Sequence, residues 1–339
     1  YPQDIIKTEK FGYATYRLKI LLPPGFVTPI AIDLPVFDSS YDIYINGKYL
    51  GGNGIPGKTE EESKPEYKRN FFRINPVTDT ITIIINVSNF HHRRGGFWLP
   101  AKFGTFVDAQ KSLANSWAGE WAVISLLIGF SVFFLFFFVI NPKEKIMGLF
   151  SMATLGLAMR PLFTSHFLIL NFVDLNWTWI VRIEYIGLFM ILIGWVWVVQ
   201  YIYPTKFFKI FCWTVTIVYG IAFILTLFLP VKLFSYSILL FYPSMLILMV
   251  YAFIVSLIAL FRKTIIDTVY FLAFLLLVIG GFHDIRVSIG NSGATSNYYL
   301  TYFVVLFVFL QAALLLYKWV MAMFEKEKLQ EDLAFLNRN

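Results

Sequence analysis

Cysteine is almost absent from this chain, which contains only Cys212, and that residue lies inside a long apolar segment. A disulfide framework is therefore excluded, so the N-terminal region needs a packed core of its own. Charged residues are also scarce, at 14%, whereas 58% of the residues are hydrophobic. This composition is typical of a membrane protein rather than of a soluble chain of the same length.

The few charged residues are concentrated towards the N-terminus. Residues 1–111 contain 25 of the 49 Lys, Arg, Asp and Glu residues, and the uninterrupted apolar runs follow Trp117. The formal net charge is +7, but Lys and Arg form no stripe interleaved with aromatic residues. We therefore predict no nucleic-acid partner. The chain begins at Tyr1 with neither Met nor an apolar leader, so if its first domain is exported we expect a signal peptide or earlier segment to have been removed.

Seven segments are long and apolar enough to cross a membrane. A transmembrane helix needs about 20 mostly apolar residues, because it rises about 1.5 Å per residue and the hydrocarbon layer is about 30 Å thick. The segments cover residues 117–140, 146–170, 177–203, 207–229, 234–261, 265–289 and 297–324. We predict a bundle of seven transmembrane helices over residues 117–324, with membrane lipid as a partner.

The short loops predict how this bundle is oriented. Lys and Arg near helix ends stay on the cytoplasmic side of a membrane. They occur in the first, third and fifth loops, as Lys143, Lys145, Lys206, Lys209, Arg262 and Lys263. In the second, fourth and sixth loops the only Lys or Arg residue is Lys232. We therefore predict an N-terminus outside and a C-terminus in the cytoplasm.

Residues 1–111 show the alternating pattern of β-strands instead of long apolar runs. Strands are predicted at 14–22, 29–37, 41–45, 80–89 and 97–105, with Asn46-Gly47 as a hairpin turn. Five or six short strands favour an all-β sandwich or jelly roll. The Gly-rich stretch 51–57 lacks the ending of a phosphate loop, and we predict a mobile loop there.

Six ionisable residues lie in the outer half of the predicted spans: Arg160, Arg182, Glu184, His283, Asp284 and Arg286. Such residues are costly in a membrane and usually pair inside the bundle. Arg182 and Glu184 are two positions apart, so they point in nearly opposite directions on a helix. We predict that Arg160 pairs with Glu184 or with Asp284. The network is either a switch between two packings or a static polar staple.

A second group of candidate residues lies in the turn before the last predicted strand: Asn89, His91, His92, Arg93, Arg94 and Trp98. An amide, an aromatic ring and arginines at strand ends are typical of a site for a sugar or an anion. The alternative is that Arg93 and Arg94 contact lipid headgroups or the outer loops of the bundle. His91 and His92 point to opposite faces of a strand and lack further ligands nearby, so we predict no metal site, and no cofactor is expected.

Residues 315–336 extend the seventh span beyond the membrane. Leu329, Leu333 and Leu336 are spaced by four and three residues, after the alternating charges of residues 325–328. This spacing is typical of a short coiled coil. Residues 325–339 are either the start of a cytoplasmic signalling helix, in a homodimer, or an amphipathic tail on the inner leaflet.

Several local patterns resemble one receptor family. In the β-domain they are the segments 16–18, 40–47, 85–90 and 94–98, in this order. In the predicted spans and their ends they are Arg182-Ile183-Glu184-Tyr185-Ile186-Gly187, Tyr203-Pro204, Phe282-His283-Asp284-Ile285 and Gln311-Ala312. The chain resembles the bacterial seven-transmembrane receptors with diverse intracellular signalling modules. The resemblance implies a galactose-binding-like jelly roll at residues 1–111 as a periplasmic sensing domain. It also implies a heptahelical transducer in the bacterial inner membrane and a cytoplasmic output module in cis, such as a kinase, cyclase or phosphatase.

The resulting hypothesis is a sensor and transducer rather than an enzyme. Its β-domain would detect an extracytoplasmic small ligand, such as a carbohydrate, or a protein. One alternative is an accessory subunit of a membrane complex. The other is a membrane enzyme that uses Glu184, His283, Asp284 and His166, for which the sequence supplies no nucleophile and base at a defined spacing.

Overall fold

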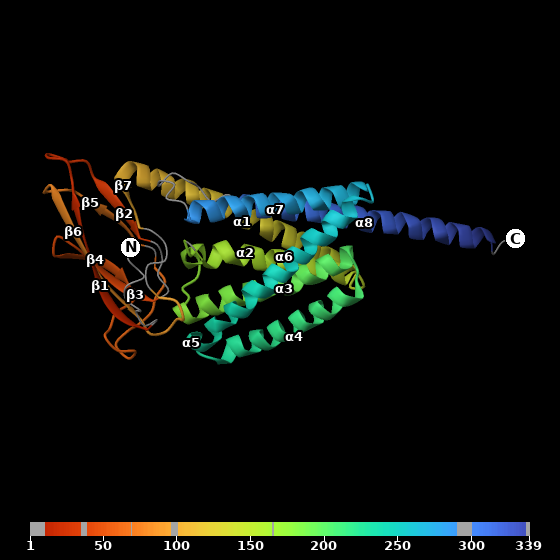
Figure 1. The fold of residues 1–339 in the computed structure, drawn as a ribbon, viewed down its shortest axis with the longest axis horizontal. Coiled ribbons are helices and arrows are strands. Elements are labelled where there is room, and N and C mark those ends of the chain that lie inside the picture. The colour runs from red at the N-terminus through yellow and green to blue at the C-terminus, as the bar shows by residue number, and fades with distance from the viewer. Residues whose placement is uncertain are drawn as a thin grey trace.

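The computed structural model describes residues 11–34, 39–68, 70–95, 101–164, 166–289 and 300–336. The β-strands lie together at one end, and the helices run lengthwise away from them (Figure 1). The last helix extends beyond the others at the opposite end, where the C-terminus lies (Figure 1). This arrangement is the predicted β-domain followed by a helical bundle.

Seven strands form the described part of the β-domain, which we call the ectodomain. They are β1 (Gly12–Leu21), β2 (Ile30–Leu34), β3 (Ser40–Ile45), β4 (Lys48–Asn53), β5 (Asn70–Ile74), β6 (Thr80–Asn89) and β7 (Lys102–Thr105). One antiparallel sheet has the order β1-β6-β3-β4 and the other has the order β5-β2-β7. The predicted all-β sandwich is therefore confirmed. Strand β5 was not predicted, and residues 96–100 of the last predicted strand and 35–38 of the second lie outside the described residues.

The core of the sandwich follows the two-residue period of its strands. Ile81, Ile83, Ile85 and Val87 of β6 are buried, as are Tyr41, Ile43 and Ile45 of β3. Strand β1 pairs with β6 and places Tyr16 opposite Ile85. Tyr16 is nevertheless 43% exposed, because β1 is an edge strand and the second sheet has fewer strands to cover the first.

Tyr41 makes the stability of this core depend on alkaline pH. Its hydroxyl accepts a hydrogen bond from Asn70 Nδ2 at 2.7 Å. Burial raises the pKa of Tyr41 to about 12, although the bond from Asn70 opposes this rise. An unfolded tyrosine ionises near pH 10. The contribution of the neutral hydroxyl is therefore complete below about pH 10 and is lost as the pH rises towards 12.

We expect the ectodomain to lose roughly 2–3 kcal/mol of stability from this group between about pH 10 and 12. Tyr41→Phe should remove that part of the loss, because phenylalanine does not ionise. The measurement is the urea midpoint of cleavage within residues 11–105 by an alkaline protease, at successive pH values and in micelles. An equal loss in both proteins would contradict the assignment to Tyr41.

The helices are α1 (Phe106–Ile140), α2 (Lys145–Phe163), α3 (Trp177–Ile202), α4 (Lys206–Phe228), α5 (Val231–Phe234), α6 (Ile238–Leu260), α7 (Ile265–Ile289) and α8 (Leu300–Leu336). With α5 and α6 taken together, seven spans of the described chain are long and apolar enough to cross a membrane, as predicted. The second span ends at Phe163 rather than at residue 170, and a 3-10 turn follows at Leu168–Asn171. Helix α8 continues to Leu336, so the helical extension is confirmed.

Helix α1 begins directly after the sandwich. Strand β7 ends at Thr105, and the Thr105 hydroxyl accepts a hydrogen bond from the Asp108 amide at 3.2 Å, which caps the helix. The helix thus starts at Phe106, well before Trp117, and the predicted domain boundary at residue 111 lies inside it. Phe106 also packs against Phe71 of the second sheet, with ring centroids 5.7 Å apart. No flexible linker separates the sandwich from the first span.

Helices α2 and α3 pack closely because both carry glycine at the contact. A Cβ atom at Gly156 would lie 2.6 Å from the Gly187 carbonyl oxygen, and one at Gly194 would lie 2.5 Å from the Ala153 Cβ. Small residues let helix backbones approach closely in a membrane, where burial of apolar surface does not drive association. These glycines therefore set the spacing at the centre of the bundle.

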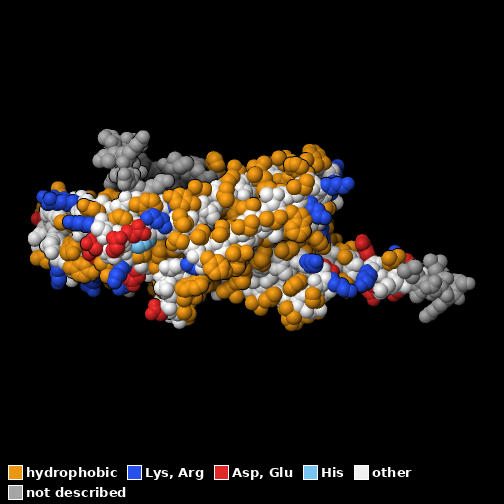
Figure 2. All heavy atoms as spheres, turned by 90° about the horizontal axis from the view of Figure 1, so that it is seen from below, with side chains coloured by type: hydrophobic (Ala, Val, Ile, Leu, Met, Phe, Trp, Pro, Cys, Tyr) orange, Lys and Arg blue, Asp and Glu red, His pale blue; other side chains and the backbone are white. Residues whose placement is uncertain are grey.

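The surface of the bundle is a broad band of hydrophobic side chains (Figure 2). Lys and Arg side chains gather at the end of the bundle from which α8 leaves, and others lie on the ectodomain (Figure 2). An apolar belt bounded by charged ends is the surface that a bilayer requires. The chain is a multi-pass membrane protein.

Candidate functional site

The ectodomain meets the bundle through a loop, residues 54–68, that follows β4. Residues 51–53 belong to β4 itself, so the prediction of a mobile loop over 51–57 was wrong for them. Beyond the strand, Ile55 and Lys64 form an antiparallel bridge. The hydroxyl of Ser88 on β6 lies 2.9 Å from those of Ser40 and Ser63. These bonds fasten the loop to the ends of the two central strands, β6 and β3, of the first sheet.

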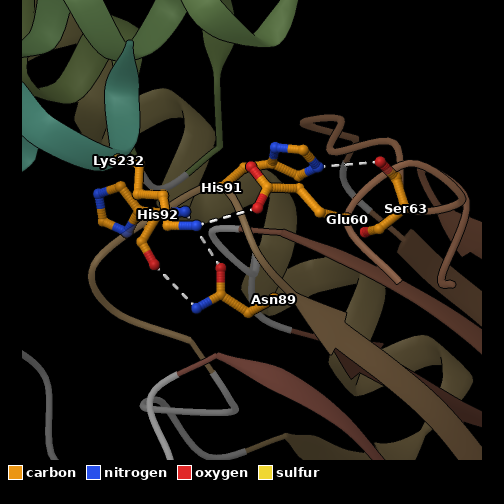
Figure 3. A network of polar contacts seen from close by, with 6 residues as sticks. All are labelled: Glu60, Ser63, Asn89, His91, His92 and Lys232. Atoms are coloured by element: carbon orange, nitrogen blue, oxygen red, sulfur yellow. Dashed lines mark hydrogen bonds and ion pairs between the residues drawn. The ribbon is translucent and has the colours of Figure 1, made fainter. Parts of the chain in front are cut away.

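The turn that begins at the last residue of β6 and covers residues 89–95 lies beside this loop and is built around Asn89. The Asn89 amide donates to the His92 carbonyl at 2.8 Å, and its oxygen accepts from the His92 backbone amide at 3.2 Å (Figure 3). The His91 ring nitrogen Nε2 lies 2.9 Å from the Ser63 carbonyl oxygen, which joins the turn to the loop (Figure 3). The loop and the turn thus form one surface, which we call the junction.

The candidate ligand residues are divided by this geometry. Asn89 and His92 are buried and hold the turn, Arg94 is exposed, and Arg93 is partly buried. Trp98 lies outside the described residues. Among the residues that are described, no three His, Cys, Asp or Glu side chains form a group that could hold a metal ion. A sugar or anion site at this turn stays a prediction.

The junction packs on the helices with aromatic side chains. Tyr67 stacks on Phe167 with ring centroids 4.2 Å apart, and it lies 6.1 Å from Trp177 at the start of α3. The His91 ring meets Trp177 edge-on at 6.4 Å. Tyr67 is only 5% exposed and belongs to the core of the bundle rather than to that of the sandwich. A residue of the ectodomain is thus part of the packing of the helices.

An ion pair adds a second contact at the junction. Lys232, on the short helix α5, lies 3.0 Å from a carboxylate oxygen of Glu60 (Figure 3). Both side chains are partly exposed, so we expect the pair to contribute less than about 1 kcal/mol to stability. The position of the ion pair matters more than its energy, because the pair connects the loop of residues 54–68 to the segment between α4 and α6.

The polar residues of the spans lie deeper. Arg160 on α2 donates to Glu184 on α3 at 2.6 Å, so one of the two predicted pairings is present. Glu184 lies seven residues after Trp177, which is about 10 Å along α3. The ion pair is therefore about two helical turns below the junction, on a helix that contacts the ectodomain.

Arg182 points elsewhere, as its spacing from Glu184 requires. Its guanidinium donates to the backbone carbonyls of Leu227 and Leu229 at the end of α4, at 3.3 Å for Leu229. It also lies 5.3 Å from the Trp179 ring and 6.0 Å from the Phe234 ring. Arg182 thus links α3 to the segment that follows α4.

The third predicted group lies on α7. His283 Nδ1 is 3.1 Å from an Asp284 oxygen, and Asp284 accepts a hydrogen bond from the Leu300 amide at 3.0 Å. The second bond ties α7 to the start of α8. The side chain of Arg286 lies outside the described residues.

One polar pair was not predicted as a pair. His166 Nδ1, in the loop after α2, lies 2.6 Å from Glu120 of α1, and its ring is 6.4 Å from that of Trp117. The sequence offered a signal, because Glu120 is an ionisable residue within the first predicted span. Together these contacts connect α1, α2, α3 and α4 near the ectodomain end of the bundle.

The fold and this junction define a class: seven helices of membrane-spanning length, with a β-sandwich that precedes the first helix and packs on the loops at one end of the bundle. Comparison with family models agrees, since the model described as 7TM diverse intracellular signalling matches residues 119–318, more than half of the chain. The chain belongs to this family of membrane receptors, which is not a family of known enzymes. Comparison with curated proteins gives no match.

Proposed function

We propose that the chain is the sensing and transducing part of a signalling receptor in the cytoplasmic membrane of a bacterium. In this proposal the ectodomain lies outside and binds a small ligand, such as a carbohydrate, or a protein. The bundle passes the change to α8, which leads to an output module in the cytoplasm, and two copies act as a dimer.

The observation that supports relay most directly is the position of Tyr67 within the core of the bundle. A side chain that belongs to the ectodomain by sequence and to the helices by packing cannot move without disturbing Trp177. Trp177 begins α3, which carries the Glu184 side of the ion pair with Arg160. Since packed interfaces change between discrete arrangements rather than deforming smoothly, a small shift at this contact is sufficient to repack α2 against α3.

The second support is α8, whose 37 residues form a single helix that leaves the bundle on the side away from the ectodomain (Figure 1). It packs against α7, whose Asp284 accepts a bond from the first residue of α8. A rotation or tilt of α7 is thereby passed to α8, which continues as one helix to Leu336.

The test uses a spin label on α8 in the protein of residues 1–339 in lipid nanodiscs. Glu331 is exposed, and Cys212 is the only cysteine within these residues, so Glu331→Cys in a Cys212→Ser background gives one label per chain. Distances between labels of two copies are measured by pulsed EPR, with and without a panel of mono- and oligosaccharides. We expect a ligand that raises the melting temperature also to change the distance distribution.

The matched variant is Trp177→Ala, which removes the ring contacted by Tyr67 and His91. We expect it to keep the rise in melting temperature, because the ligand binds the sandwich, but to lose the change at α8. Even without a ligand, its resting distance distribution should differ from that of the wild type. Identical distributions in both proteins, or an unchanged response in the variant, would contradict relay through the junction.

A further inference from the structure

A cleft of about 340 Å³ opens on the side of the bundle between α4 and the α5–α6 segment. Its walls are almost entirely apolar, and several of the side chains that line it, including Ile221, Leu225 and Leu240, are exposed on the outer surface. This surface lies within the hydrophobic belt of the bundle, so the cleft opens towards lipid rather than towards water.

The length and depth of the cleft match one leaflet of a bilayer. It extends along α4 from Val218 to Leu229, just beyond the end of the helix. The eleven steps between these two residues correspond to about 16 Å of helix, and one leaflet contributes about half of a hydrocarbon layer about 30 Å thick. Lys232 lies beside the Leu229 end of the cleft and contacts the ectodomain. The cleft therefore lies in the half of the membrane that faces the ectodomain.

The cleft has one polar group without a partner. The Tyr219 hydroxyl donates to Ser244, and the Thr226 hydroxyl donates to the Ala222 carbonyl. The Ser237 hydroxyl oxygen is buried and makes no hydrogen bond. Ser237 stands at the ectodomain end of the cleft, immediately before α6. A buried hydroxyl without a partner is costly, and rotation of the Ser237 side chain towards an acceptor in the cleft would remove that cost.

Positive charge lies around the same end. Arg182 contacts the Leu227 and Leu229 carbonyls, its Nε makes no hydrogen bond, and no described carboxylate forms an ion pair with it. Lys232 precedes Leu233, which lines the cleft. From the membrane centre outwards, the wall is thus first apolar, then carries a free hydroxyl, and then is flanked by two cations. That order matches an acyl chain, an ester and a phosphate.

We propose that this cleft binds a phospholipid of the ectodomain-side leaflet, with one acyl chain along α4. The Ser237 hydroxyl donates to an ester carbonyl of the lipid, and Arg182 and Lys232 attract its phosphate. The site depends on the membrane assignment of the bundle and not on the proposed ligand of the ectodomain. A bound lipid would contact the walls formed by α4 and α6 at the same time and would so stabilise the segment between these helices. Arg182 connects α3 to this segment, and Lys232 connects the ectodomain to it.

The test uses the protein of residues 1–339 in nanodiscs containing phosphatidylglycerol with a photoactivatable group on one acyl chain. After illumination, labelled peptides are identified by mass spectrometry. We expect labelling of the cleft walls on α4 and α6. Ala222→Trp fills the cleft and should abolish most of it, whereas Ile224→Trp, on the exposed side of the same helix and outside the lining, should leave it unchanged.

Ser237→Ala tests the hydroxyl with less risk to folding. Loss of one hydrogen bond should lower retention of phosphatidylglycerol on dilution into detergent by about fivefold, with an unchanged melting temperature. Equal labelling in wild type and Ala222→Trp, together with equal retention in wild type and Ser237→Ala, would show loosely associated boundary lipid only and would overturn the proposal. Equal labelling by a diacylglycerol probe that lacks the phosphate would overturn the role of Arg182 and Lys232.

Discussion

Replacing Glu184 with glutamine is expected to destabilise the bundle by about 2 kcal/mol. The change removes the negative charge that lies 2.6 Å from Arg160 and leaves the arginine without compensation at that contact. Fully buried pairs lose about 3–5 kcal/mol when one partner is removed. The Arg160 side chain is 41% exposed, which places the expected loss below that range. The measurement is thermal unfolding of the protein in nanodiscs.

Two controls separate the ion pair from the substitution itself. Glu327→Gln removes a carboxylate from an exposed position on α8 and should leave the melting temperature unchanged. Arg160→Gln combined with Glu184→Gln should be less destabilised than the sum of the two single variants, because the partners are coupled. Additive losses would mean that the two charges act independently.

The same variant distinguishes a switch from a staple. If the Arg160–Glu184 pair is a staple, Glu184→Gln lowers stability but leaves the α8 label distances as in the wild type. If the pair biases two packings of α2 against α3, the resting distances change and the effect of a ligand is altered. Asp284→Asn provides a second site for the comparison, because Asp284 contacts α8 directly.

Replacing Gly156 with leucine is expected to cost about 3 kcal/mol and to lower the yield of folded protein sharply. Even a Cβ atom at Gly156 would meet the Gly187 carbonyl at 2.6 Å and the Ile191 side chain at 3.0 Å. Backbone atoms cannot move aside as a flexible side chain does, so α2 and α3 must separate. The measurement is the recovery of monodisperse protein and its melting temperature in detergent.

Gly220→Leu is the matched control for this prediction. Gly220 also lies within a membrane-length helix, but a Cβ atom there would meet nothing within 4 Å. It therefore tests the effect of leucine in place of glycine in a span without the clash. Similar losses for both variants would show that helix propensity, and not the contact between α2 and α3, explains the result.

The seven spans could be predicted because hydropathy over about 20 residues is a strong signal, and the predicted bounds 265–289 are those of α7, but the start of α1 could not be predicted in this way. Helix α1 begins at Phe106, but residues 106–116 include Asp108 and Lys111 and so break the apolar run. The threonine cap at Thr105 was the available signal for that start. Strand β5 was missed because Asn70–Ile74 is only five residues long and includes Arg73.

Charge and depth predicted that Arg160 pairs with Glu184 or with Asp284, since each residue needs a partner at its own level in the membrane. The structure shows Glu184 as the partner. The junction could not be predicted. Tyr67, Phe167 and Trp177 are far apart in the chain, and each looks like an ordinary aromatic residue in its own segment. Only the tertiary fold brings their rings together. The same holds for Ser237, whose importance comes from the absence of a partner.

Because α1 follows β7 directly, it fixes the rotation and the height of the sandwich relative to the helical bundle. Each residue added to a continuous helix between Thr105 and Trp117 would turn the sandwich by about 100° and raise it by about 1.5 Å relative to the bundle. Tyr67 and His91 would then face away from Trp177. The number of residues in the part of α1 between the strand and the membrane therefore determines whether the ectodomain can contact the helical bundle at all.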